Sequence, residues 1–189
     1  NRRELESIDL ERCRKAVKRL AEAEPISYRD DITRRLIQLL KEADAPLQGD
    51  ICRALEIWAQ PDDVKATDAT GLALQKLSLA KTPPPREMVE FLVKRKSEVV
   101  APILDRLWAA DSTVWEQLYG EIGPEIEPLV MARFKSASVP LKHSAMRLLA
   151  RVGGKASLPL IQSTKEGADS EMRVLIERAE TAIRARAGA

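Results

Sequence analysis

The chain has 189 residues, of which 44% are hydrophobic and 32% charged, an ordinary composition for a globular protein. Its 31 basic and 29 acidic residues leave a formal net charge of +2, so the charge of the whole molecule does not indicate nucleic-acid binding. No run approaches the roughly 18 apolar residues of a membrane span, and no signal-peptide pattern is present, so we expect no membrane insertion. Because the chain begins at Asn1, we expect a fragment or a processed form.

The composition favours helices. Aromatic residues make up only 4% of the chain, so the core must consist of Leu, Ile, Val and Ala. Leu and Ala are good helix formers, and no stretch alternates apolar and polar residues long enough to require a strand. The sequence therefore predicts an all-α protein.

The first part of the chain predicts four amphipathic helices separated by proline or Asp-Pro breaks. Residues 4–23 place apolar side chains, including Ile8, on one helical stripe that ends at Pro25. The same periodicity predicts further helices over residues 28–43, 47–60 and 62–80.

The triple proline Pro83-Pro84-Pro85 is a firm break, because proline blocks helix continuation. It predicts a linker over 82–86 between a long-repeat half and a short-repeat half, although a polyproline ligand for a partner domain is the alternative. Beyond it, periodicity predicts helices over 86–95, 98–109, 113–122 and 125–136.

The stretch Val139–Ser163 contains the clearest pattern. It predicts a helix, a break at Gly153-Gly154 and a second helix opened by Ser157 and Pro159. The two glycines are too short a motif for a phosphate loop, and we interpret them as a left-handed helix C-cap. A last helix is expected to follow, capped by Asp169 or Ser170, and Asp111 or Ser112 is expected to cap the helix over 113–122.

The breaks recur at a nearly regular interval. Successive breaks are separated by 36, 36, 27, 30 and 34 residues, and each interval holds two helices. Helix pairs repeated every 20–50 residues are typical of an α-solenoid. We therefore predict a single domain over 1–189, with ten to eleven helices in about five stacked pairs; the breaks lie at Pro25, Pro61, Ser97, Pro124, Gly154 and Gly188.

Three segments resemble HEAT repeats: Ile122–Leu129, Ala145–Ile161 and Asp169–Arg173 followed by Ala179. The resemblance covers about residues 98–189 well and residues 1–97 loosely. It implies a right-handed α-α superhelix that serves as a protein-binding scaffold, and similar bacterial domains are often modules of larger proteins. It also implies that ligands bind the concave side, which favours Arg133, Lys135, Gln162 and Lys165 on second helices.

An acid-free segment is the candidate binding site. Residues 128–165 carry 7 basic and no acidic side chains, whereas residues 61–127 carry 8 basic and 12 acidic ones. Such a patch suits an acidic protein partner, a phosphate or nucleic acid. The alternative is a solvated helix face balanced by acids on neighbouring repeats. The candidate residues are Arg133, Lys135, Lys142, His143, Arg147, Arg151 and Lys165.

Other features carry little chemistry. His143 is the single histidine and has no partner residues in the sequence that would make it a catalytic base. Cys13 and Cys52 are expected to be buried thiols in a reducing compartment, which favours the cytoplasm, although a disulfide between stacked helices remains an alternative. We expect no metal site and no cofactor.

A nucleic-acid-binding enzyme is the alternative function. HEAT-like DNA glycosylases use aromatic and acidic residues, and Trp108, Asp111 and Trp115 lie close together in the sequence. The simpler interpretation is that these two tryptophans and Trp58 pack in the core. We therefore predict a non-catalytic interaction or assembly scaffold that binds an acidic protein partner, with nucleic acid disfavoured.

Overall fold

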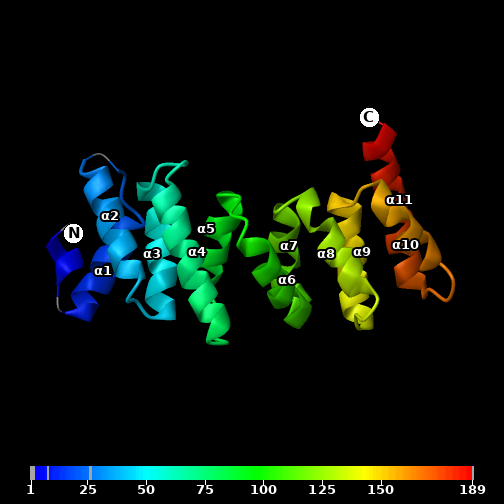
Figure 1. Ribbon diagram of the computed structural model, residues 1–189, viewed down its shortest axis with the longest axis horizontal. Coiled ribbons are helices and arrows are strands. Elements are labelled where there is room, and N and C mark those ends of the chain that lie inside the picture. Colours follow the sequence, from blue (N-terminus) through cyan, green and yellow to red (C-terminus); the bar gives the residue numbers. More distant parts are fainter. Residues whose placement is uncertain (1–2, 8, 26, 189) are drawn as a thin grey trace. The chain divides into compact units, whose positions relative to one another are not determined.

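The computed structural model describes residues 3–7, 9–25 and 27–188, and within these ranges it contains helices and no strand (Figure 1). The predicted all-α class is confirmed. The elements of the described chain are η1 (Arg3–Glu6), α1 (Leu10–Leu20), α2 (Arg29–Leu40), α3 (Ala45–Trp58), α4 (Val64–Leu79), α5 (Arg86–Lys94), α6 (Val100–Ala110), α7 (Ser112–Glu121), η2 (Pro124–Ile126), α8 (Glu127–Phe134), α9 (Val139–Val152), η3 (Lys155–Ser157), α10 (Leu158–Ser163) and α11 (Ser170–Gly188).

Aspartate caps determine where several helices begin. The Asp111 carboxylate accepts hydrogen bonds from the Thr113 and Val114 amides, and Asp169 accepts one from the Met172 amide at 2.7 Å. Both predicted caps are confirmed, because an N-cap acceptor satisfies amides that the helix itself leaves unpaired.

The first expected helix is divided. Asp9 caps α1 by accepting a hydrogen bond from the Glu11 amide at 3.0 Å, so the chain forms η1, a break and then α1 rather than one helix over 4–23. Ile8, which the apolar stripe was expected to include, lies outside the described residues.

The prediction of a left-handed cap at the Gly-Gly break is wrong. Gly153 has φ of −67° and Gly154 has φ of −111°, so neither is left-handed. Close packing explains Gly153 instead, because a Cβ there would lie 2.6 Å from the Leu149 carbonyl oxygen. The Gly154 amide donates to the Glu127 carboxylate at 2.9 Å, and the same carboxylate accepts the Ser157 hydroxyl.

The chain divides into two compact units, unit 1 (Asn1–Val100) and unit 2 (Ala101–Ala189). The proline segment at 82–86 lies inside unit 1, because α5, which follows it, packs against α3 and α4. The prediction of one repeat domain with a break at the prolines stays a prediction.

In unit 1, α3 packs against α1, α2 and α5, and α2 also packs against α4 (Figure 1). The end of α3 forms hydrogen bonds to both α1 and α2. Trp58 is buried and its indole N–H donates to the Leu20 carbonyl at 2.8 Å, which links α3 to α1. Cys13 and Cys52 are both buried and form no disulfide, so the expected buried thiols are confirmed and the disulfide alternative is not.

In unit 2, α9 packs against α7, α8 and α11, and α10 packs against α11. Trp108 is fully buried; its indole N–H donates to the Ser144 hydroxyl at 2.7 Å, and its ring lies 5.3 Å from the ring of Tyr119. Arg186 on α11 donates to the Ala150 carbonyl at 2.8 Å and so caps the end of α9. Trp58 and Trp108 are therefore core residues, and Trp115 is half-buried.

Candidate interaction groove

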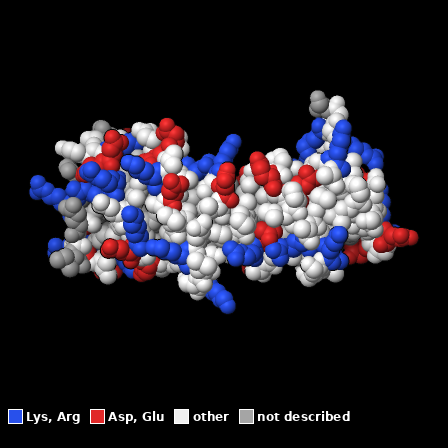
Figure 2. Space-filling view, in the orientation of Figure 1, with Lys and Arg blue, Asp and Glu red and all other residues white. Residues whose placement is uncertain are grey.

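The structure separates the seven predicted basic residues into groups with different neighbours. Three of them form ion pairs with carboxylates: Arg133 with Asp105, Arg147 with Glu116 and Lys165 with Glu180. The segment is therefore acid-free in sequence but not in space. On the visible face of unit 2, acidic side chains lie among a row of basic ones along the lower edge (Figure 2).

Arg133 belongs to a partly buried network. Its guanidinium donates to the carboxylate of Asp105, with Nε 3.1 Å from Oδ2, and the Tyr119 hydroxyl donates to the same carboxylate at 3.1 Å. The hydrogen bond with Asp105 raises the pKa of Arg133, and burial raises the pKa of Tyr119. The pair with Asp105 uses Nε and Nη2 of Arg133, and Arg133 does not line the cavity between α7 and α9.

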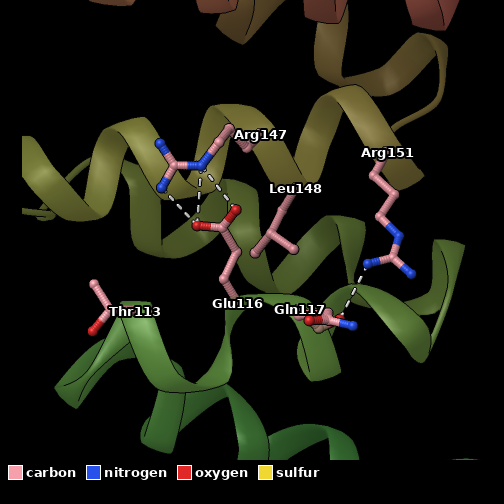
Figure 3. A pocket seen from close by; sticks show the side chains of 6 residues that line it. All are labelled: Thr113, Glu116, Gln117, Arg147, Leu148 and Arg151. Atoms are coloured by element: carbon pink, nitrogen blue, oxygen red, sulfur yellow. Dashed lines mark hydrogen bonds and ion pairs between the residues drawn. The ribbon is translucent and has the colours of Figure 1, made fainter.

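Arg147 and Arg151 do come together, on one face of α9, as their spacing of four predicts. They line an open groove of about 490 Å³ between α7 and α9, together with Thr113, Glu116, Gln117 and Leu148 (Figure 3). We call this the α7–α9 groove.

Both arginines link α9 to α7, which forms the opposite side of this groove. Arg147 donates from Nε at 2.8 Å and from Nη2 at 2.7 Å to Glu116, and this hydrogen bonding raises the pKa of Arg147. Arg151 donates one Nη1 hydrogen to the Gln117 carbonyl at 3.2 Å (Figure 3). Gly120 permits the approach, because a Cβ there would lie 3.0 Å from Arg151 Nη1. A guanidinium has five N–H donors, so both groups keep donors beyond those that the described residues use.

The remaining candidates do not join the groove. Lys142 lies over the Phe134 ring, 5.8 Å from its centroid, and no ion pair joins the exposed Lys135 side chain to another described residue. His143 is largely buried, with Nδ1 3.4 Å from Glu171 and Nε2 3.6 Å from Asp169. It thus has acidic neighbours that the sequence did not reveal.

Two residues of the glycosylase hypothesis, Trp108 and Asp111, have structural roles. Trp108 has no exposed face on which a base could stack, and Asp111 is used as a helix cap. The Thr113 hydroxyl donates to Asp111 at 2.6 Å, and this hydrogen bond lowers the pKa of the exposed Asp111 carboxyl. Among the described residues, no group of three or more His, Cys, Asp or Glu could hold a metal ion.

The acidic members of these sites were not predicted from the sequence, although the sequence carries a signal for them. Glu116 precedes Arg147 by 31 residues, and Asp105 precedes Arg133 by 28, which is about one repeat interval in each case. A search for opposite charges one repeat apart would have found both pairs.

Comparisons with known protein families, with curated proteins and with solved structures found no match. A separate inspection of the described helices found none that is both long and apolar enough to cross a membrane.

Proposed function

We propose that this chain is a non-catalytic protein-interaction module and that the α7–α9 groove binds a carboxylate-bearing segment of a protein partner. The half-used guanidinium groups of Arg147 and Arg151 carry this proposal. Arg147 donates two of its N–H groups to Glu116 and Arg151 donates one to the Gln117 carbonyl, so each guanidinium has further N–H groups with which to bind a ligand. Arginine is well suited to a carboxylate, because its planar fork can donate two parallel hydrogen bonds.

The form of the groove favours a protein segment over a small metabolite. The groove is open to solvent, whereas small-molecule sites usually enclose most of their ligand. Leu148 supplies an apolar floor between the two arginines, which suits a side chain flanked by acidic residues.

We also propose that the helices form a HEAT-like α-solenoid. Two observations support this proposal. Alternate helices pack together within each unit: α3 packs with both α1 and α5 in unit 1, and α9 packs with both α7 and α11 in unit 2. Ion pairs between helices in unit 2 join residues about one repeat apart, as in Glu116 with Arg147. Stacked helix pairs of this kind serve as scaffolds because they present an extended surface for their length.

The test uses a fluorescein-labelled oligoglutamate peptide, with an oligoglutamine peptide as the neutral probe. We expect the full chain to bind only the acidic peptide, with salt weakening the complex. Replacing Arg147 and Arg151 together by Gln should lower the affinity about tenfold, since each partly exposed charge pair contributes about 0.7 kcal/mol.

Arg178→Gln is the matched control, because it removes an exposed arginine of the same unit that lies outside the groove. An equal loss of affinity in this control would contradict the proposal and indicate non-specific charge attraction. Duplex DNA in the same assay tests the alternative function. Binding of DNA that depends on the groove arginines would replace the protein partner by nucleic acid.

A further inference from the structure

A second cavity lies in unit 1, away from the residues of the proposed function. It has a volume of about 210 Å³ and lies where the end of α2 and the start of α3 meet one face of α4. We call it the α4 pocket; it is lined by Lys41, Gln48, Ala69, Leu72, Ala73 and Lys76.

Gln48 gives this pocket an unsatisfied hydrogen-bond acceptor. The side chain is only 7% exposed, and its Nε2 donates to the Leu40 carbonyl at 3.2 Å. That bond fixes the orientation of the amide, so the other end, Oε1, is buried without a donor among the described residues. A buried acceptor without a partner is costly, and a ligand with an N–H or O–H would remove the cost.

The rest of the pocket is apolar and positively charged. Ala69, Leu72, Ala73 and Lys76 follow one another at helical spacing, so they share one face of α4. Leu72 is 60% exposed and Leu79, two turns further along the helix, is 85% exposed, which is unusual for large apolar side chains. The charged side chains that line the pocket are both lysines, so it complements an acidic ligand.

The size of the pocket limits what can occupy it. Pockets for small-molecule ligands typically begin at about 300 Å³, which is larger than this one. The volume instead suits one large side chain that anchors a partner, and such anchors at protein interfaces are most often Trp, Tyr or Arg. The two lysines disfavour Arg, whereas Trp and Tyr combine an apolar ring with the N–H or O–H that Gln48 lacks.

We propose that the α4 pocket is a docking site for a Tyr or Trp side chain in an acidic segment of a protein partner. The ring packs on Leu72 and the two alanines, and neighbouring carboxylates pair with Lys41 and Lys76. Gln48 Oε1 has no solvent-accessible surface in the free protein, so a shift of the Gln48 side chain accompanies binding and lets the polar end of the ring donate to it. This inference goes beyond the α7–α9 groove, because it uses another unit, other residues and another chemistry.

The test is an NMR titration of the full ¹⁵N-labelled chain with a short acetylated and amidated peptide that carries a central Tyr among Glu and Leu. We expect amide shifts around Gln48 and over residues 69–76. A peptide with Phe in place of Tyr keeps the ring and loses the donor, so it should bind about 2- to 10-fold more weakly. A Trp peptide should bind as well as the Tyr peptide.

Two pairs of variants separate the pocket from general attraction. Lys76→Gln should weaken binding about threefold and reduce its salt dependence, whereas Lys65→Gln, an exposed lysine of the same helix outside the pocket, should not. Leu72→Ala should weaken it about fivefold, whereas Val64→Ala should not, although Val64 is 66% exposed. Exposed positions were chosen so that the variants remain folded.

Three outcomes would overturn the proposal: equal binding of the Tyr and Phe peptides at the α4 pocket, no amide shifts at the α4 pocket, or equal effects of the matched variants. A fourth is self-association that Leu72→Ala abolishes in sedimentation velocity, since the occupant would then be a second copy of the chain. Arg151→Gln should leave the shifts at the α4 pocket unchanged and alter only those at the α7–α9 groove, so failure of one proposal can be told apart from failure of the other.

Discussion

The two units bury different kinds of polar side chain. Among its described residues, unit 1 buries only uncharged ones, namely Thr33, Gln48 and Thr70. Unit 2 buries two serines and two carboxylates, and the carboxylates are Asp105 and Glu180. In both units an arginine binds carbonyls at a helix end, Arg29 in unit 1 and Arg186 in unit 2, so the difference lies in the buried carboxylates of unit 2.

Unit 1 relies on main-chain carbonyls at the end of α3. The Trp58 carbonyl accepts hydrogen bonds from Arg29 Nε at 2.7 Å and from the Thr33 hydroxyl at 2.9 Å, and Arg29 also reaches the Ile57 carbonyl at 3.1 Å. Carbonyls at a helix end lack intrahelical donors and carry partial negative charge, so a cation satisfies them well. Such acceptors do not titrate.

Unit 2 relies on buried carboxylates, each of which needs a donor to be stable. Asp105 has Arg133 and Tyr119, and Glu180 has Lys165 at 2.9 Å. A carboxylate left without its partner in such a place costs several kcal/mol. We therefore expect a substitution that removes a polar partner to lower the free energy of unfolding more in unit 2 than in unit 1.

The largest expected effect is the protection of Cys52, which reports on unit 1 alone because both cysteines lie there. Burial raises the pKa of the Cys52 thiol from 9.0 to about 12. Only the thiolate is alkylated, so at about pH 8 the folded protein should react on the order of a thousandfold more slowly than an ordinary thiol. Timed iodoacetamide pulses with mass spectrometry measure this ratio.

The direction of the pH dependence follows from the same shift. Between about pH 9 and pH 12 the folded state keeps the thiol proton that the unfolded state has lost, so the stability of unit 1 falls as the pH rises through this window. Fast alkylation of Cys52 in native buffer would show that unit 1 opens readily and would contradict a well-packed α3.

The second prediction concerns Asp105. Replacing it by Ala leaves the Arg133 guanidinium and the buried Tyr119 hydroxyl without their shared acceptor. Since Arg133 can still reach water, we expect a loss of about 2–3 kcal/mol, at or below the lower end for a broken buried pair. Urea unfolding followed by hydrogen exchange locates the loss.

The matched variant is Asp105→Asn, which keeps the shape and an acceptor for Tyr119 and should cost less than Asp105→Ala. If the two units unfold separately, these variants should affect unit 2 alone. Cys52 alkylation should stay slow in both variants at urea concentrations that loosen unit 2. If alkylation accelerates together with the exchange in unit 2, the two units do not unfold separately.

The third prediction concerns Arg29. Arg29→Met keeps much of the side-chain volume and removes donors from the carbonyls at the end of α3, for a loss of about 1.5–2 kcal/mol. Arg34→Met is the control, because Arg34 is 70% exposed and pairs with Asp31 within its own helix. Denaturation in low and high salt measures both; a loss at Arg29 that salt abolishes would mean that exposed charges, not carbonyls, stabilise this joint.

The local features of the fold could be predicted from the sequence, because their causes lie within a few residues. Asp111 and Asp169 cap helices where expected, and the prolines fall at breaks. The Gly153-Gly154 break was placed correctly, but its conformation was not. The conformation of the break is determined by contacts with Leu149 and Glu127, and Glu127 lies in α8, one helix before the helix that the break ends.

The candidate site could be predicted only in part, for the same reason. The spacing of Arg147 and Arg151 gives their shared face, which is a property of one helix. The partners Glu116 and Asp105 lie about one repeat earlier, so a segment without acids in sequence faces acids in space. A basic run in a repeat protein should therefore be compared with the repeat before it.

The smallest effect on stability is expected at Arg147. Its pair with Glu116 is partly exposed, with 44% of the Arg147 side chain accessible, so Arg147→Met should cost less than about 1 kcal/mol. The same variant removes part of the proposed carboxylate site and should weaken oligoglutamate binding by several-fold. The two measurements distinguish the roles of the residue. A large loss of stability with unchanged binding would make Arg147 a structural counterpart of Arg133, whereas a small loss with weakened binding is the result expected if the α7–α9 groove binds a partner.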